Sequence, residues 1–500
     1  MFRQSLKKSS VLLLALAFLA ISISVQSAVS AASTDDTSKS VELRWYVVGN
    51  GQQADTDLVL KKVNEYIKSK INATLKLETF MWGSDFENKM VAKIVSGEKF
   101  DITFTSNWAL NYRNWALKGA FVNITDMLDI YAPETKAILG ENLLKGAEVN
   151  GKVYAIPTFG TSSAGSYGVL LNKNMVSKYK VDTSKIKKLE DLESTFKKIK
   201  ANSPKTLDFY PFNQYSDSIY NTLNYDKLST ANVPGAVKRD GKSTKVVNDF
   251  DTSEAKSLFN LMNKWYKSGY INKSTNASDT YFENNASNIF AFYSLLTPTK
   301  CQEIAAVYGI DTIPVELGNR TMTTYNATGS MQAISRTSKN PERALMFLEL
   351  FNTDLYLSNM INYGIEGIHY KKTGNQSISL LSRGYNSYNP STSFVFGNQS
   401  IVYSLPGCSP SVTSEKNLRA YIDKTTKSPL LGFSFNSNPV KDQVSKFESI
   451  TNKYLTDLSI GKVNPSTNLQ KMNNEFKNAG LQKVLTEMQK QVDAFVKADY

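Results

Sequence analysis

The 500-residue chain is poor in the side chains that enzymes most often use for metal binding and acid–base chemistry. It has one histidine, His369, and two cysteines, Cys301 and Cys408. One histidine excludes a histidine-rich zinc site and leaves a single candidate base for a serine or cysteine nucleophile. Two cysteines cannot form a tetrathiolate zinc site or hold an iron–sulfur cluster. Phosphate-binding glycine loops and the G-x-S-x-G hydrolase elbow are missing from the sequence as well. We therefore expect no metal, no cofactor and no catalytic residue.

Long apolar runs are also scarce, and the one that stands out, Val11–Val25, lies near the start of the chain. Basic residues precede it and the small residues Ser27–Ala32 follow it, which is the pattern of a signal peptide. We predict that residues 1–31 are this signal peptide, with cleavage after Ala31 or Ala32. The alternative is an uncleaved anchor helix, for which a run of fifteen residues, two of them serines, is short. No cysteine follows the run, so a lipid-modified N-terminal cysteine is not expected.

Acidic residues are outnumbered, 45 against 58 lysines and arginines, which gives a net charge of +13. Removing the three positive charges of residues 1–31 leaves +10 on the exported chain. The lysines are scattered along predicted helices without an arginine block, which favours a solubilising surface and no nucleic-acid partner. Acidic partners, such as an anionic cell wall or a uronic-acid sugar, remain an alternative. Outside the cell, Cys301 and Cys408 either form a disulfide or stay as two buried thiols.

Strand and helix patterns alternate at the start of the exported chain. Three segments rich in β-branched and aromatic residues are predicted to be strands: Val41–Val48, Ala73–Phe80 and Phe100–Thr105. Apolar residues at helical spacing separate them. The second of these helices is expected to begin at a capping box, Ser84–Glu87, and to end at Gly97. This order predicts a parallel sheet with a ligand at the carboxyl ends of its strands. Two more amphipathic helices are expected within the last 70 residues.

Aromatic and amide residues are the conspicuous chemical feature. Trp82 and Trp108 each follow a predicted strand, where an α/β sheet presents its ligand. A flat ring there suits the apolar face of a sugar, and the neighbouring Asn107 suits its hydroxyl groups. The alternative is that these tryptophans belong to the core. Trp115 and Trp265 lie within helical patterns and are predicted to be core residues.

Several motifs resemble those of one protein family. Asn150–Pro157 followed by Leu170–Met175 resembles the interlobe crossing of family 1 extracellular solute-binding proteins, the receptors of ABC sugar importers. Gly119–Asp126 is similar to the segment that follows their third strand. Three further motifs resemble a subgroup with a C-terminal domain of unknown function: Ser338–Ala344, Asn362–Tyr370 and Leu431–Lys441.

This resemblance implies a class II periplasmic-binding-protein-like α/β fold, with two lobes, a ligand cleft between them and extra C-terminal helices. The expected N-terminal lobe comprises residues 32–155 with about 300–352, and the C-terminal lobe 156–299 with about 353–430. Residues 431–500 are expected to form a helical segment packed on the lobes. Lobe crossings are placed near Tyr154–Phe159, Leu296–Thr299 and Phe351–Asn359.

The implied function is capture of an oligosaccharide and its delivery to the membrane permease of an ABC importer, by an exported monomer. The predicted stacking rings are Trp82, Trp108 and Phe159. The predicted hydrogen-bonding partners are Asn50, Asn107, Tyr325, Glu366 and, from the second lobe, Tyr215. For Glu366 the alternative is a carboxylate that braces its own loop. The rival functions are a secreted carbohydrate-active enzyme with two catalytic carboxylates and a surface adhesion or scaffolding protein.

We predict that the exported protein begins at Ala32 or Ser33 and carries no lipid, because small residues follow the apolar run and no cysteine does. The intact mass of protein collected from the culture medium checks both points. A mass that includes residues 1–31, or an added acyl chain, would contradict the prediction.

Overall fold

The computed structural model describes residues 37–164, 166–203, 207–211, 219–230, 232–271, 285–297, 300–405 and 415–499. The chain divides into two units, Met1–Ser40 and Val41–Tyr500, and the structure below is that of the second unit. Within the described residues, every helix is too short or too polar to cross a membrane. The predicted signal peptide, Tyr215 and Cys408 lie outside these residues.

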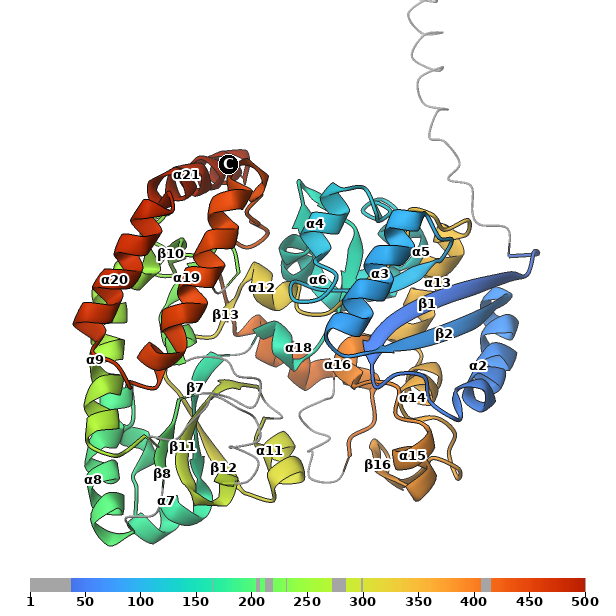
Figure 1. Cartoon of the computed structure of the whole chain (residues 1–500). Coiled ribbons are helices and arrows are strands. Elements are labelled where there is room, and N and C mark those ends of the chain that lie inside the picture. The colour runs from blue at the N-terminus through green and yellow to red at the C-terminus, as the bar shows by residue number, and fades with distance from the viewer. Residues whose placement is uncertain are drawn as a thin grey trace, which may run out of the picture. The chain divides into compact units, whose positions relative to one another are not determined.

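The first of two main sheets contains the three predicted parallel strands (Figure 1). Here β1 (Val41–Gly49) lies between β2 (Ala73–Met81) and β3 (Ile102–Thr105) and pairs in parallel with both. The connecting helices are α2 (Thr56–Ile71) and α3 (Ser84–Ser96). The predicted β-α-β-α-β order is confirmed, and the carboxyl ends of all three strands lie at one edge.

Two strands from later in the chain complete this sheet. β14 (Met331–Ile334) pairs antiparallel with β3, and β6 (Ala155–Pro157) pairs antiparallel with β14. The resulting order is β2-β1-β3-β14-β6. Residues near position 330 are therefore fixed beside the strand that precedes Trp108.

The predicted capping box at the start of α3 is wrong. The N-cap residue is Gly83 rather than Ser84, and no side chain caps this helix. Glu87 instead accepts a hydrogen bond from the backbone amide of Leu110, with 2.5 Å between Oε2 and N. A tertiary contact with the loop after β3 has thus replaced the local motif. The predicted end of the helix is confirmed, because Gly97 is left-handed with φ of 71°.

Trp45 lies at the centre of the core beside the first sheet. Its ring makes edge contacts with Phe347, Phe351 and Phe396 at centroid distances of 5.6, 5.4 and 5.6 Å. Its Nε1 donates to Gln332 Oε1 over 2.8 Å, which satisfies the buried indole N–H. These contacts join β1 to β14 and to the helix α13 (Pro341–Thr353).

The second main sheet has the order β12-β7-β11-β8. Its strands are β7 (Ser166–Asn172), β8 (Leu207–Tyr210), β11 (Ile289–Leu296) and β12 (Thr312–Glu316). On α9 (Ser253–Lys267), Trp265 has no exposed surface and contacts the rings of Phe196 and Phe209 at 4.9 and 5.1 Å. The prediction that Trp265 is a core residue is confirmed.

Three C-terminal helices, rather than the expected two, pack on this second core. They are α19 (Lys441–Ser459), α20 (Pro465–Asn478) and α21 (Leu481–Asp499), and α19 and α20 both lie along α9 (Figure 1). Gly461, in the turn between α19 and α20, has φ of 77°, and a Cβ there would lie 2.1 Å from Met262 O. Only glycine fits this approach of the turn to α9.

The path of the chain between the two sheets differs from the predicted division at two places. The second sheet continues beyond the predicted crossing at Leu296–Thr299, because β12 pairs with β7. The predicted crossing at Phe351–Asn359 lies within the first core, where Phe351, Leu357 and Ile361 are buried together. The chain instead connects the sheets through residues 158–165, 317–330 and 424–430. The parallel strands β13 (Thr321–Met322) and β17 (Thr426–Lys427) lie in the last two of these segments.

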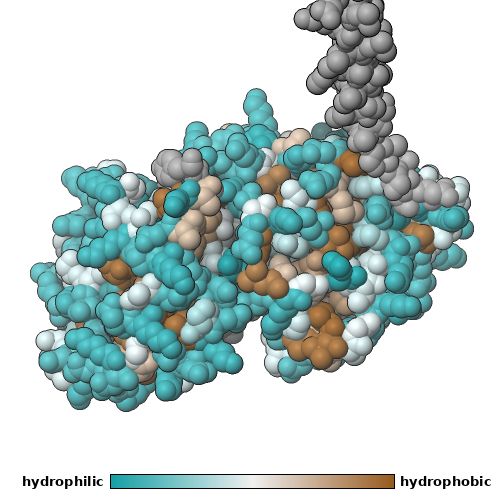
Figure 2. All heavy atoms as spheres, turned by 90° about the horizontal axis from the view of Figure 1, so that it is seen from above, coloured by the Kyte–Doolittle hydropathy of each residue, from teal (hydrophilic) through white to brown (hydrophobic). Residues whose placement is uncertain are grey.

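Hydrophilic residues cover most of the face seen in Figure 2, with apolar residues in separate patches. Among the described residues, all the large apolar side chains that are strongly exposed belong to segments around the first sheet. They are Met81, Trp82, Val95, Trp108, Leu117, Ile130, Tyr325, Leu355, Tyr356 and Tyr385. Since isolated exposed apolar residues are common, their one-sided distribution is the informative feature.

Candidate functional site

Three predicted site residues meet at the carboxyl edge of the first sheet. Asn50 follows β1, Trp82 follows β2, and Trp108 follows β3. The indole Nε1 of Trp82 donates to Asn50 Oδ1 over 2.9 Å. The Trp82 and Trp108 rings are stacked with centroids 6.2 Å apart and planes 26° apart. The parallel strands thus bring together three residues that are widely separated in the sequence.

The two tryptophans are not core residues. Trp82 is 39% exposed and Trp108 is 44% exposed. Trp108 rests on the buried ring of Phe104, with 5.5 Å between centroids, and its Nε1 donates to Gly329 O over 2.7 Å. Because packing and a hydrogen bond fix the ring, its exposed face is held ready to contact a flat apolar surface.

Asn107 connects this loop to the segment that carries Tyr325. Its Nδ2 donates to Tyr325 O over 2.6 Å and to Thr328 Oγ1 over 3.3 Å. Its Oδ1 is buried and has no hydrogen-bond partner in the described part of the chain. A buried acceptor without a partner is unusual and needs an explanation. Tyr325, on the short helix α12 (Thr324–Ala327), is itself 60% exposed.

The loop after β1 is held by a distant part of the chain. Asn50 donates from its backbone N to Pro390 O and from Nδ2 to Asn389 O, each over 2.9 Å. Gln53 Nε2 donates back to Gly51 O over 2.8 Å. The acceptor oxygen that Asn50 offers to Trp82 is therefore fixed in position.

An ion pair anchors the same loop at Asp55. Arg383 donates to both carboxylate oxygens of Asp55, over 2.5 Å from Nε and 2.8 Å from a terminal nitrogen. His369 Nδ1 accepts from the Ile365 amide, so the ring proton is on Nε2, which lies 3.1 Å from Asp55 Oδ2. The Arg383 hydrogen bonds are the main cause that lowers the pKa of Asp55 to about 2, and the His369 contact lowers it further.

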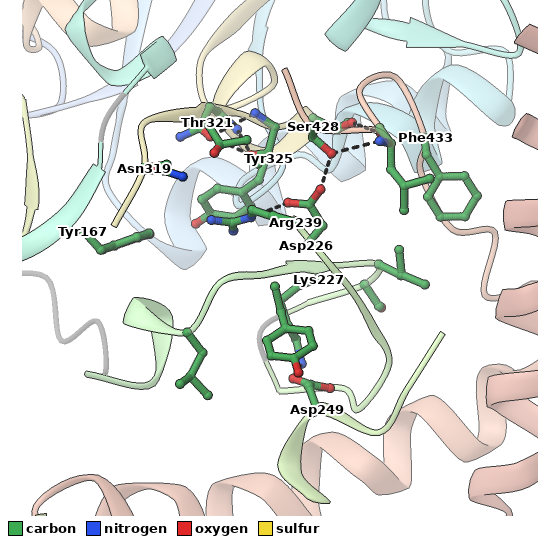
Figure 3. A pocket seen from close by; sticks show the side chains of 18 of the residues that line it. Tyr167, Asp226, Lys227, Arg239, Asp249, Asn319, Thr321, Tyr325, Ser428 and Phe433 are labelled. Atoms are coloured by element: carbon green, nitrogen blue, oxygen red, sulfur yellow. Dashed lines mark hydrogen bonds and ion pairs between the residues drawn. The ribbon is translucent and has the colours of Figure 1, made fainter. Parts of the chain in front are cut away.

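Tyr325 also lines a cavity (Figure 3). Its walls come from the start of β7, the hairpin of β9 (Tyr225–Lys227) and β10 (Ala236–Lys238), and residues 319–326 and 428–433. Two of these wall segments belong to the connections between the sheets. The cavity therefore lies where the two halves of the fold meet.

The charged residues of this cavity form two pairs. Arg239 Nε lies 2.5 Å from Asp226 Oδ1, and the Ser428 hydroxyl donates to the other oxygen of Asp226. Lys227 Nζ lies 2.5 Å from Asp249 Oδ2. Among the described lining residues no other is charged, so this part of the wall has two cations, two anions and no net charge.

The remaining predicted site residues do not join this cluster. Phe159 is only 2% exposed and belongs to the first core, with the Arg419 guanidinium 5.4 Å from its ring centroid. As a buried ring it offers no stacking face, so that prediction is corrected. Glu366 is exposed, pairs with Lys372 at 3.0 Å and does not line the cavity, which agrees with the loop-bracing alternative. Tyr215 lies outside the described residues.

Sequence reasoning missed Asp226 and Arg239. The two residues come together because β9 and β10 pair antiparallel, with Asp226 opposite Val237. The one local signal was the dipeptide Pro234-Gly235, which marks a turn and hence a hairpin. Nothing in the sequence indicated that this hairpin faces residues 319–326.

Comparisons with known families give a clear assignment. A family model described as bacterial extracellular solute-binding protein matches residues 70–354, more than half of the chain. The chain belongs to this family. A second model, a domain of unknown function (DUF3502), matches residues 429–497, which include α19 and α20.

Relatives in Streptococcus pneumoniae match nearly the whole chain. A carbohydrate ABC transporter substrate-binding protein is 29% identical over 461 residues, 91% of each chain. The crystal structure of the N-glycan transport solute binding protein NgtS is 28% identical, covers 92% of this chain and 100% of that chain, and has a TM-score of 0.81. The same protein in complex with Man5GlcNAc is 28% identical over 92% and 100% of the chains, with a TM-score of 0.69. The fold is thus the two-lobed class II periplasmic-binding-protein fold, as the sequence motifs predicted.

We expect the Asp55–Arg383 pair to stabilise the protein in a pH-dependent way. The pKa of Asp55 is about 2 in the folded state and about 4 when unfolded, so the stabilisation is present above pH 4. It is lost as the pH falls from 4 through 2, because the carboxyl group is then neutral. Arg383→Gln should therefore lower the free energy of unfolding at pH 5–7, by an amount that shrinks toward pH 2.

Urea unfolding at a series of pH values measures this difference. Arg336→Gln is the matched control, since among the described residues Arg336 is an exposed arginine in no ion pair. A difference for Arg383→Gln that stays constant down to pH 2 would contradict the assignment.

Proposed function

We propose that the chain is an extracellular receptor that captures an oligosaccharide and delivers it to the permease of an ABC importer. The observation that carries this proposal is the pair of half-exposed tryptophans held beside Asn50 and Asn107 at the strand ends. Rings that offer apolar faces beside a few fixed amides suit a sugar, which has apolar ring faces and a hydroxyl rim. The relatives, a carbohydrate ABC transporter substrate-binding protein and an N-glycan transport solute binding protein, support the same class of ligand.

Within this proposal, Trp82 and Trp108 stack on sugar rings, and Tyr325 offers a third exposed ring. Asn107 Oδ1, which has no partner inside the protein, accepts a hydrogen bond from a sugar hydroxyl. Asn50 mainly orients Trp82 through the hydrogen bond to its indole. Phe159 supports the site from the core, while roles for Tyr215 and Glu366 rest on the sequence alone.

We propose that the two lobes are residues 41–157 with 322–423, and 166–316 with 428–499, and that they close on the ligand. This division follows the two sheets and the two buried cores. The TM-score to NgtS is 0.72 and 0.69 for its complexes with Man1GlcNAc and Man5GlcNAc, and 0.81 for the third NgtS structure. Sequence identity hardly changes among the three, so the spread supports a change in lobe arrangement on binding.

A receptor needs no catalytic group, and the cavity supports that reading. Both of its carboxylates, Asp226 and Asp249, are engaged in ion pairs. A glycosidase would instead need two carboxyl groups flanking the scissile bond, one of them acting as a general acid. The protein acts as a monomer outside the cell, after cleavage of the leader and without a lipid anchor.

A thermal-shift screen tests the proposed function. Probes are Man1GlcNAc, Man5GlcNAc and the two-unit and five-unit members of the malto- and fructo-oligosaccharide series. A ligand present at 100 times its Kd should stabilise the protein by about 2.7 kcal/mol. We expect at least one probe to bind, to remain chemically unchanged and to reduce the radius of gyration measured by solution scattering. No binding across the panel, or conversion of a probe into products, would overturn the proposal.

Trp108→Ala separates a ligand-contacting ring from a core ring. Loss of the stacking face should weaken binding by about 1–3 kcal/mol, as for a residue that anchors an interface. Stability should change much less, because a half-exposed ring leaves no sealed cavity. Calorimetric titration and urea unfolding of the same variant measure the two effects.

The buried Trp265 provides the control for this experiment. Trp265→Ala should lower the free energy of unfolding by about 3–5 kcal/mol. The affinity of the protein that remains folded should stay the same. If Trp108→Ala behaved in this way instead, Trp108 would be removed from the site.

A further inference from the structure

Ser166 is an unusual residue in the wall of the cavity beside Tyr325. It is only 2% exposed, and its buried Oγ has no hydrogen-bond partner among the residues that the structure describes. A buried hydroxyl that makes no hydrogen bond costs stability, since water would otherwise solvate it. Its position in the lining points to a ligand that supplies the missing partner.

Arg239 presents unused donors to the same cavity. Its Nε is bound to Asp226, which in turn accepts from Ser428. In the part of the chain that the structure describes, its two terminal nitrogens donate no hydrogen bond. Asp226 therefore fixes the plane of the guanidinium while the terminal N–H groups stay available. A planar fork of donors matches two neighbouring oxygens, such as adjacent hydroxyls of a sugar ring.

The charge of the wall limits what can bind. Asp226 pairs with Arg239, and Asp249 pairs with Lys227. Each charged side chain of the described wall therefore already has a partner of opposite charge. A neutral ligand enters such a cavity without leaving a buried charge unpaired. A uronic acid would compete with Asp226 for Arg239.

Tyr325 connects the cavity with the tryptophan pair. Its side chain lines the cavity, while its backbone oxygen accepts from Asn107, next to Trp108. Figure 3 shows the Tyr325 ring near Arg239 at the upper wall. One ligand chain can therefore pass from the tryptophans over Tyr325 to Arg239.

We propose that this cavity is a second sugar subsite, in which Ser166 Oγ and the terminal nitrogens of Arg239 bind a neutral unit of the same oligosaccharide. This inference rests on the proposed function. It assigns to the receptor a preference for neutral oligosaccharides long enough to reach both the tryptophan pair and the cavity.

Ser166→Ala provides the sharpest test, because this change removes a hydroxyl that makes no hydrogen bond in the protein. Stability should stay the same or rise. Calorimetric titration should show the affinity for the long probes, Man5GlcNAc and the five-unit malto- and fructo-oligosaccharides, falling roughly three- to tenfold. The affinity for Man1GlcNAc and the two-unit probes, which reach only the tryptophans, should hardly change. Trp108→Ala should weaken long and short probes alike.

Thr312→Val is the matched control. Thr312 Oγ1 is also a buried hydroxyl without a partner, on the neighbouring strand β12, but it does not line the cavity. This variant should bind every probe as the wild type does. Arg239→Lys, which keeps a cation beside Asp226 but removes the fork, should repeat the length-dependent loss.

The outcomes separate the two proposals. If the wild type binds no probe, the proposed function fails and the subsite with it. If the wild type binds long probes and Ser166→Ala binds them equally well, only the subsite is overturned. Tighter binding of a five-unit oligogalacturonate than of the neutral probes would also overturn it. The expected result is a loss confined to long neutral probes in Ser166→Ala and Arg239→Lys.

Discussion

Two backbone carbonyls hold the candidate site together. Both accept hydrogen bonds from side chains of the loop after β3. Asn107 donates to Tyr325 O, and Trp108 donates to Gly329 O. The short helix α12, which carries Tyr325, is fixed from two other sides. On one side, α12 packs against Gly146 of α6 (Pro133–Gly146). The approach is so close that a Cβ added to Gly146 would lie 2.3 Å from Ala327 Cβ. On the other side, Thr324 Oγ1 accepts from the Gly432 amide over 2.9 Å.

This arrangement makes the ligand site and the connection between the sheets parts of one structure. Residues 317–330 carry the chain from β12 in the second sheet to β14 in the first. The same residues orient Trp108 and, through Tyr325, form a wall of the cavity. A ligand that touches both lobes stabilises the closed state only by its difference in affinity between the states. In the proposed closure, contacts at this connection are well placed to create such a difference, because residues 317–330 join the two lobes.

The sequence predicted those features that depend on local strand and helix patterns and on the parallel pairing of the strands. Strand signals at Val41–Val48, Ala73–Phe80 and Phe100–Thr105 led to the correct sheet, and hence to Trp82 and Trp108 at one edge. The prediction failed where a tertiary contact replaced a local motif. Glu87 accepts a hydrogen bond from the Leu110 amide instead of capping its own helix. Lobe membership was also mispredicted near Leu357, because a buried apolar helix face does not reveal which core receives it. The described cavity residues come from five separate segments, so no spacing in the sequence could have indicated them.

Two buried polar atoms without hydrogen-bond partners affect both the stability of the empty protein and its affinity for a ligand. Asn107 Oδ1 lies beside the tryptophan pair and Ser166 Oγ in the cavity wall, and both are buried without a partner. Each such atom lowers stability by about 1–3 kcal/mol relative to a satisfied one. Replacing Ser166 by alanine would remove that cost, so the empty receptor gains nothing from this hydroxyl, whereas Asn107 also donates to Tyr325 O and Thr328 Oγ1. A ligand rich in hydroxyl groups changes the balance, because each new hydrogen bond then satisfies an atom that water no longer reaches. Polar groups held unsatisfied, beside rings held exposed, are the features expected of a surface shaped for a sugar rather than for its own interior.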